Sequence, residues 1–101
     1  MRKIGERVGA LSHSDGDTAY LFGFGTYRGE EVPPPGVQCM GIDLHDMGHT
    51  NPKIELDSGK VVWGCECWWG GEGAVRKRLS QFTNVVDVDI DEARARAKGE
   101  Q

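Results

Sequence analysis

Three tryptophans and two of the three cysteines of this 101-residue chain fall within one short stretch, Lys60–Gly71. If the stretch is one β-strand, its successive side chains point to opposite faces. One face is apolar and carries Val61, Trp63, Cys65, Cys67 and Trp69. The other face carries Val62, Gly64, Glu66 and Trp68. Such a strand is either the central strand of a small core or the wall of a ligand pocket.

A chain of this length forms one domain with one modest core. Hydrophobic residues make up 38% and charged residues 28%, which fits a small domain with much surface. The 15 glycines are scattered among apolar and aromatic residues, as at tight turns, bulges and close strand crossings, and argue against a helical bundle. We therefore expect a single domain over residues 1–101.

Turn signals divide the first two-thirds of the chain into short strands. Asp15-Gly16 predicts a hairpin between strands at 6–12 and 18–27. In the second of these strands, Gly23 and Gly25 indicate a bulge, a bend or a closely packed neighbour. The strand places Tyr20, Phe22 and Phe24 on one face.

A second hairpin follows a long excursion. Pro33–Gly36 cannot lie inside a sheet, a short strand is expected within 37–44, and 45–52 reads as the longest loop. A tight turn at Asp57–Lys60 then joins a strand at 53–57 to the Trp63 strand.

The pattern changes after Gly73. Val75, Leu79 and Phe82 are spaced as on one face of a helix. Residues 85–90 alternate again, which predicts a strand with Val86, Val88 and Ile90 pointing inward. Asp91 is the expected N-cap of a helical stub at 92–98. The stub offers only alanines for burial, so we expect 91–101 to be a weakly docked, dispensable tail.

These elements predict an α+β protein that is mainly antiparallel β, with one helix in its C-terminal half. Short strands and abundant glycine favour a small, strongly bent sheet or a partly closed SH3-like barrel. The alternative is an open α+β sheet with the Val75 helix on one face.

Charge and hydropathy narrow the classes of partner. The net charge of −4 argues against nonspecific binding to nucleic acid, which depends on phosphate neutralisation by Lys and Arg. No apolar run approaches the roughly 18 residues of a membrane span, and residues 1–7 are followed by no signal-peptide core. Cys65 and Cys67 are poorly placed for a mutual disulfide. We therefore expect three reduced thiols in an acidic, cytoplasmic protein.

Three pieces of the chain carry a resemblance. They are Arg7–Ala10, Leu21–Tyr27 and the segment from Asn51 to Trp69. Together they resemble a group of small uncharacterised proteins of bacteria and their phages or plasmids. No activity is attached to that group, so the resemblance assigns no catalytic residue. It implies a phage or mobile-element origin and, by association, a small inhibitor of a host system.

The leading candidate site is the polar face of the Trp63 strand. There Trp68 and Glu66 would combine a stacking ring with a hydrogen-bonding carboxylate, beside the gap at Gly64. Further partner-binding residues are expected on the second strand and in the excursion, namely Tyr20, Tyr27, His45 and His49. In the alternative reading, Trp63 and Trp69 are core and Trp68 packs under the Pro33 loop.

A competing interpretation is a zinc site or a thiol enzyme. Its potential ligands are Cys39, His45, His49, Cys65 and Cys67. Zinc sites pair closely spaced ligands on turns, whereas Cys-x-Cys here lies in a predicted strand. A reactive thiol would need a nearby cation or a helix N-terminus, and no Cys-x-x-Cys motif supports one.

Two other motifs are weaker. Gly70–Gly73 opens the predicted helix like an anion cradle, yet Glu72 sits where a phosphate would bind, so a sharp strand-to-helix turn is the simpler reading. The basic triplet Arg76–Arg78 is most often a solvated helix face, although it could dock an acidic partner.

We therefore expect a non-enzymatic binding protein with no metal, cofactor or catalytic residue. Its partner would be a protein or a small polar ligand, with no membrane involved and homo-oligomers possible.

Overall fold

The computed structural model describes residues 2–99, and the last two residues of the expected tail lie outside that range. The fold is α+β and mostly antiparallel β, with three short helices in the described part. In chain order the elements are β1 (Arg7–Asp15), β2 (Thr18–Glu31), β3 (Gln38–Cys39), β4 (Ile42–Asp43), α1 (Leu44–Met47), β5 (Asn51–Leu56), β6 (Val61–Trp63), the 3-10 turn η1 (Gly64–Glu66), β7 (Trp68–Gly71), α2 (Glu72–Leu79), β8 (Asn84–Asp87) and α3 (Ile90–Gly99).

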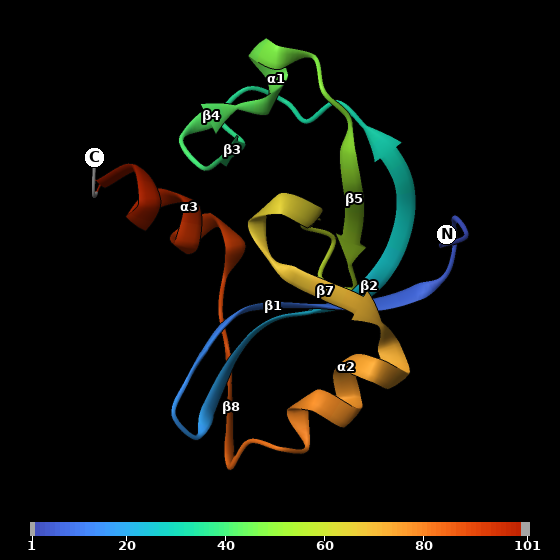
Figure 1. The fold of residues 1–101 in the computed structure, drawn as a ribbon, viewed down its shortest axis with the longest axis vertical. Coiled ribbons are helices and arrows are strands. Elements are labelled where there is room, and N and C mark those ends of the chain that lie inside the picture. Colours follow the sequence, from blue (N-terminus) through green and yellow to red (C-terminus); the bar gives the residue numbers. More distant parts are fainter. Residues whose placement is uncertain (1, 100–101) are drawn as a thin grey trace.

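The main sheet has the order β6-β5-β2-β1-β7, and β8 pairs in parallel with the start of β2. Within residues 2–99, β6 and β7 are the two ends of this order, so the sheet is open. Figure 1 shows β2 as a long curved strand, with the β3–β4–α1 excursion near one end and α2 near the other. The β1–β2 hairpin projects away from the excursion, with β8 beside it.

Gly23 and Gly25 of β2 indicated a bulge, a bend or a closely packed neighbour, and the structure shows a close neighbour at Gly25. A Cβ on Gly25 would lie 2.2 Å from the carbonyl oxygen of Glu55, so only glycine lets β5 approach at this point. Gly23 has a φ of +143°, a conformation that side chains rarely adopt. The pairing of β2 with β5 shifts register between Tyr27 and Glu30.

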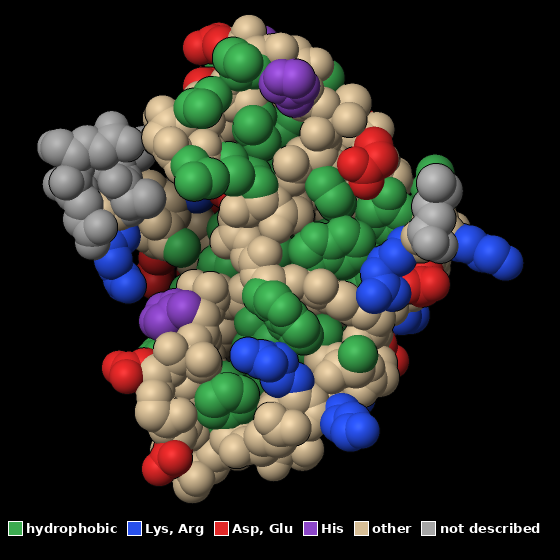
Figure 2. All heavy atoms as spheres, viewed as in Figure 1, with side chains coloured by type: hydrophobic (Ala, Val, Ile, Leu, Met, Phe, Trp, Pro, Cys, Tyr) green, Lys and Arg blue, Asp and Glu red, His purple; other side chains and the backbone are tan. Residues whose placement is uncertain are grey.

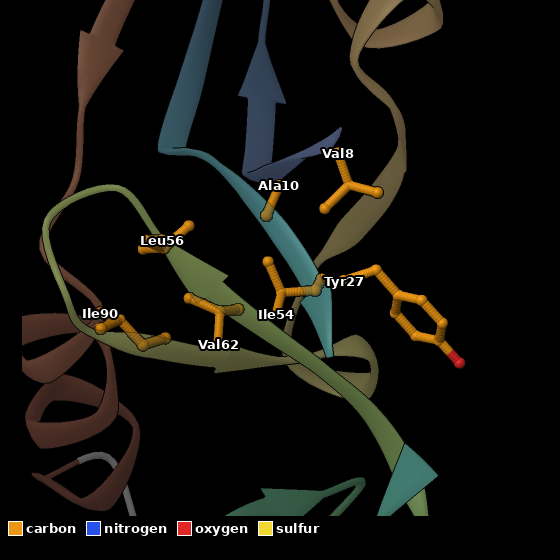
Figure 3. Packing of buried hydrophobic residues seen from close by; sticks show 7 residues of the cluster. All are labelled: Val8, Ala10, Tyr27, Ile54, Leu56, Val62 and Ile90. Atoms are coloured by element: carbon orange, nitrogen blue, oxygen red, sulfur yellow. The ribbon is translucent and has the colours of Figure 1, made fainter. Parts of the chain in front are cut away.

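The core consists of two clusters. The larger contains Val8, Ala10, Tyr27, Ile54, Leu56, Val62 and Ile90 (Figure 3). The smaller contains Leu11, Ala19, Leu21 and Val75, with Leu79 and Phe82 packed against it. The helical spacing therefore predicted the inward face of α2 correctly at Val75 and Leu79, whereas Phe82 packs against the same cluster from the loop after the helix.

Two local predictions about the C-terminal third are wrong. Val86 is 43% exposed rather than inward, because β8 bonds beside the projecting end of the β1–β2 hairpin. The last helix begins at Ile90, and its N-cap is Asp89, whose carboxylate accepts a hydrogen bond from the Asp91 N–H.

The segment 45–52, expected to be a loop, contains a short helix. The helix α1 occupies its start, and Asp43 caps that helix.

Candidate functional site

The predicted strand through Lys60–Gly71 is broken in the structure, and this changes which side chains share a face. Gly64–Glu66 form the 3-10 turn η1 between β6 and β7. A Cβ on Gly64 would lie 2.8 Å from the Pro52 ring and 2.9 Å from the indole nitrogen of Trp69, so the turn requires glycine there. The amide side chain of Asn51 accepts from the Cys65 N–H at 2.8 Å and fixes the turn. Alternation along the sequence cannot reveal such contacts.

Glu66 therefore does not lie beside Trp68 on a strand face. Its Oε1 accepts from the backbone N–H of Trp63 at 3.0 Å and from Arg94 Nη2 at 2.7 Å, and its Oε2 accepts from Arg94 Nε at 2.7 Å. Only 9% of the Glu66 side chain and 27% of the Arg94 side chain are exposed. The hydrogen bond to Glu66 raises the pKa of Arg94 above its ordinary value. Both oxygens of the Glu66 carboxylate are thus hydrogen-bonded within the fold.

The same ion pair covers the outer edge of β6. Besides holding Glu66, Arg94 Nη2 donates to the carbonyl oxygen of Val61 at 3.0 Å. The Trp63 N–H and the Val61 C=O, which an edge strand would otherwise leave unpaired, both find partners in this way. Arg94 is a residue that the sequence prediction missed, because only the alanines of the last helix were considered for burial. Whether α3 is dispensable stays a prediction.

The other predicted partner-binding residues are dispersed. Tyr20 stacks on His13 in the β1–β2 hairpin, with ring centroids 4.4 Å apart and an interplanar angle of 14°. His45 lies in α1, near the other end of the molecule (Figure 1), and its Nδ1 is 3.1 Å from the carbonyl oxygen of Pro33. His49 is exposed in the following loop.

Tyr27 is part of the core. It is 7% exposed, stacks on Trp69 with centroids 5.5 Å apart, and donates its hydroxyl to Glu30 at 2.6 Å. The hydrogen bond to Glu30, followed by burial, raises the pKa of Tyr27. Its ring is thus used for packing and is not presented to a partner.

Trp68 is exposed, but its neighbour is a cation rather than a carboxylate. Its side chain is 47% exposed, and the guanidinium of Arg78 lies 4.8 Å from the ring centroid. Arg76 lies over Phe24 at 4.3 Å, and Arg2 lies over Trp69 at 5.5 Å. We call Trp68, Arg78, Phe24 and Arg76 the Arg–aromatic face. Trp69 and Arg2 lie on the opposite side of β7, because Trp69 packs with the larger core cluster and its strand partner Ala10. Figure 2 shows Lys and Arg side chains lying against hydrophobic ones over β7 and α2.

The cations of the Arg–aromatic face are only partly neutralised. Arg76 is 3.6 Å from Glu72. On the opposite side of β7, Arg2 pairs with Glu6. Among the ion pairs within residues 2–99, none involves Arg78 or its exposed neighbour Lys77. The sequence contained a signal for this arrangement, because a sharp turn at Gly70–Gly73 folds α2 back beside the strand that bears Trp68.

The predicted zinc ligands, Cys39, His45, His49, Cys65 and Cys67, do not form one metal-binding group in the described chain. Within the described chain, no three His, Cys, Asp or Glu side chains form a group that could hold a metal ion. Burial is the main cause that raises the pKa of both Cys65 and Cys67 to about 12, so these thiols are protonated at neutral pH. The thiol of Cys67 points to the carbonyl oxygen of Trp63 at 3.6 Å.

Two cavities adjoin the Glu66–Arg94 pair. The larger, about 600 Å³, lies against Pro33–Val37 and includes Val61, Trp63 and His45 in its lining. The smaller, about 280 Å³, is lined by Ser12, Phe22, Gly36, Gln38, Cys65, Glu66, Ile90, Ala93 and Arg94. Arg94 of α3 borders both cavities.

Comparisons with protein-family models, with curated proteins and with solved structures find no match to this chain. Among the described residues, no helix is long and apolar enough to cross a bilayer.

Proposed function

We propose that this protein is a non-enzymatic interaction protein that binds an acidic surface of a partner protein through the Arg–aromatic face. The observation that supports this most is the exposed Trp68 ring with Arg78 above it. Trp and Arg are the residue types most enriched among the energetically dominant positions of protein interfaces. An arginine stacked on an indole keeps its hydrogen-bond donors free for carboxylates, because stacking uses only the flat face of the guanidinium.

Charge distribution supports an acidic partner. The chain has a net charge of −4, yet Arg76, Lys77 and Arg78 follow one another on an exposed helix next to Trp68. A local cationic patch on an anionic protein orients a partner of complementary charge. It also favours a compact acidic surface over a long nucleic acid, whose phosphates the rest of the chain would repel.

The scaffold suits such a role. The sheet places β1, β2, β5 and β6 side by side in that order. After β6 the chain passes through η1, and β7 then pairs with the other side of β1. We propose that this order belongs to a small, partly closed barrel of the SH3-like kind, in which η1 brings the two ends of the sheet towards each other. Recognition residues carried by β7 and α2 are then held on a rigid framework, which limits the entropy lost on binding.

The biological setting extends this proposal and rests on the resemblance to small bacterial and phage proteins. A cytoplasmic protein of phage or mobile-element origin that inhibits a host system would need an interaction surface and no catalytic site. The thiol-enzyme alternative is less well supported, since burial keeps Cys65 and Cys67 protonated.

The test is affinity capture from bacterial lysate with four immobilised chains: the unmodified protein, Trp68→Ala, Arg78→Glu and Arg96→Glu. The last is the matched control, because Arg96 is also an exposed arginine, carried by α3. We expect an acidic host protein to be retained by the unmodified chain and by Arg96→Glu. Trp68→Ala and Arg78→Glu should each weaken its binding by about tenfold or more, and added salt should weaken it further.

Three outcomes count against the proposal. A partner held equally by all four chains does not use this face. Capture that disappears after nuclease treatment, together with tight binding of a fluorescent single-stranded oligonucleotide, assigns the face to nucleic acid. Loss of binding on deletion of 92–101, with no effect of Trp68→Ala, places the site at α3 instead.

A further inference from the structure

Cys39 and Cys65 come together in the structure although 26 positions separate them in the chain. Cys39 ends β3 in the excursion, and Cys65 lies in the middle of η1. The Cys39 thiol points to the carbonyl oxygen of Cys65, with Sγ 3.9 Å from that oxygen. Both residues are partly exposed, and both are free thiols.

The Cys39 thiol also acts on the Cys65 thiol. Burial first, and then the hydrogen bond and the charge of the Cys39 thiol, raise the pKa of Cys65 to about 12. This influence agrees with the 3.9 Å contact between the Cys39 thiol and the Cys65 carbonyl oxygen. Cys67 differs, because the causes acting on it are burial and the charges of Glu66 and Cys65, with none from Cys39.

The local structure explains why Cys39 faces the turn. β3 and β4 form a hairpin whose two central residues, Met40 and Gly41, have φ values of 54° and 81°. Positive φ at both central positions is the geometry of a tight two-residue hairpin turn. Met40 is 97% exposed at the tip, whereas Cys39 is turned inward towards η1.

We propose that Cys39 and Cys65 are a redox-sensitive pair that forms an intramolecular disulfide on exposure to a small-molecule disulfide such as oxidised glutathione. The bond would tie the excursion to η1. Gly36 and Gln38 on one side, and Cys65 and Glu66 on the other, line the cavity of about 280 Å³. The cross-link would therefore join two walls of that cavity and fix its width.

The chemistry proceeds in two exchange steps. Because a raised pKa makes the Cys65 thiolate scarce, the Cys39 thiolate attacks the glutathione disulfide first and releases one glutathione thiolate. Cys65 then loses its proton to solvent and attacks the Cys39 sulfur, which releases the second glutathione. The two protein thiols lose two protons and two electrons in total, and the glutathione disulfide is reduced to two thiols. Once Cys39 is in the mixed disulfide, its own thiol no longer raises the pKa of Cys65.

The test uses the full chain with oxidised glutathione at about pH 8.5, where a larger fraction of the thiols is ionised. We expect the main product to be a monomer that has lost two hydrogen atoms. Peptide mapping without reductant should show one linked pair, containing Cys39 and Cys65. Cys67→Ser, altered in the same short segment, should form the same link, whereas Cys39→Ser and Cys65→Ser should not. Mapping the unmodified protein decides the question even if a variant fails to fold.

The cross-link should also raise the melting temperature by roughly 10 °C, because it constrains the unfolded chain. A link between Cys65 and Cys67, a disulfide-linked dimer, glutathione retained on Cys39 without a cross-link, or no reaction would each overturn the proposal. Binding through the Arg–aromatic face does not involve these thiols, so failure here leaves the proposed function standing.

Discussion

The two ends of the main sheet come from the same tryptophan-rich segment but use their side chains in opposite ways. At the β6 end, Glu66 and Arg94 bond to each other and to the backbone of the edge strand, and Trp63 is 4% exposed. At the β7 end, Trp68 is 47% exposed and Arg78 lies over its ring without a carboxylate partner in the described chain.

The difference separates side chains that stabilise the fold from side chains that we expect to bind a partner. A charge that is withdrawn from water must be paired, and removing one partner is costly. An exposed arginine over an indole stays hydrated, so its desolvation penalty is small. The contact stabilises the fold by no more than about 0.5–1 kcal/mol. The β6 end should therefore govern the free energy of unfolding, and the β7 end should govern binding.

Trp63→Ala gives the largest expected effect. Trp63 packs at the end of β6 and is almost wholly buried. Removal of a large core aromatic should lower the free energy of unfolding by about 3–5 kcal/mol, measured by urea denaturation. A loss below about 1 kcal/mol would mean that the β6 end is not part of the cooperative core.

Glu66→Ala should follow, with a loss of about 2–4 kcal/mol, because the Trp63 N–H loses its acceptor and the half-buried Arg94 loses the carboxylate that neutralises it. Arg94→Ala in the same background should cost much less than it does alone. A double-mutant cycle measures this coupling. Additive effects would show that the two side chains do not depend on each other.

Acid should loosen α3 at the β6 end. The hydrogen bonds from Lys60 and from the Asp91 N–H lower the pKa of Asp89 below its ordinary value. The stabilisation is therefore complete above the ordinary carboxyl pKa of about 4 and is lost as pH falls through the lower folded value. Amide hydrogen exchange of α3 should report this loss.

Asp89→Asn is the control for the acid experiment, since it keeps an acceptor for the helix N-terminus but removes the charge that Lys60 contacts. The Asp89 part of the pH dependence should disappear in this variant. An unchanged profile would assign the acid sensitivity of α3 to other carboxylates.

Arg78→Ala is expected to have the smallest effect on stability, at most about 0.5–1 kcal/mol, while abolishing most of the binding to an acidic partner. Stability is measured by urea denaturation and affinity by titration with the captured protein. Strong destabilisation with unchanged affinity would reverse the roles assigned to the two ends of the sheet.

Local patterns predicted much of the scaffold. Short-range signals predicted the β1–β2 hairpin, which turns at Gly16-Asp17, the β5–β6 hairpin, the inward face of α2 and the burial of Trp63. Each depends on neighbours within a few residues, where backbone preference and hydrophobic spacing act directly.

The candidate site was predicted less well. Trp68 is 47% exposed, but its neighbour is Arg78 and not Glu66, which the sequence placed beside it. The error came from one turn. A side-chain bond from Asn51 and a close contact between Gly64 and Pro52 interrupt the strand, and both partners lie more than ten positions away.

The sequence by itself determined the class of this protein: a small α+β domain that is mainly antiparallel β and rich in glycine turns. Hydrophobic periodicity and turn-forming residues are local features, so a single sequence is enough to recognise them. Only the tertiary structure decided that Arg94 neutralises Glu66, that Arg78 covers Trp68 and that Cys39 meets Cys65. Those pairings depend on how distant segments cross in space, because a charge or a thiol acquires its role from the group it faces.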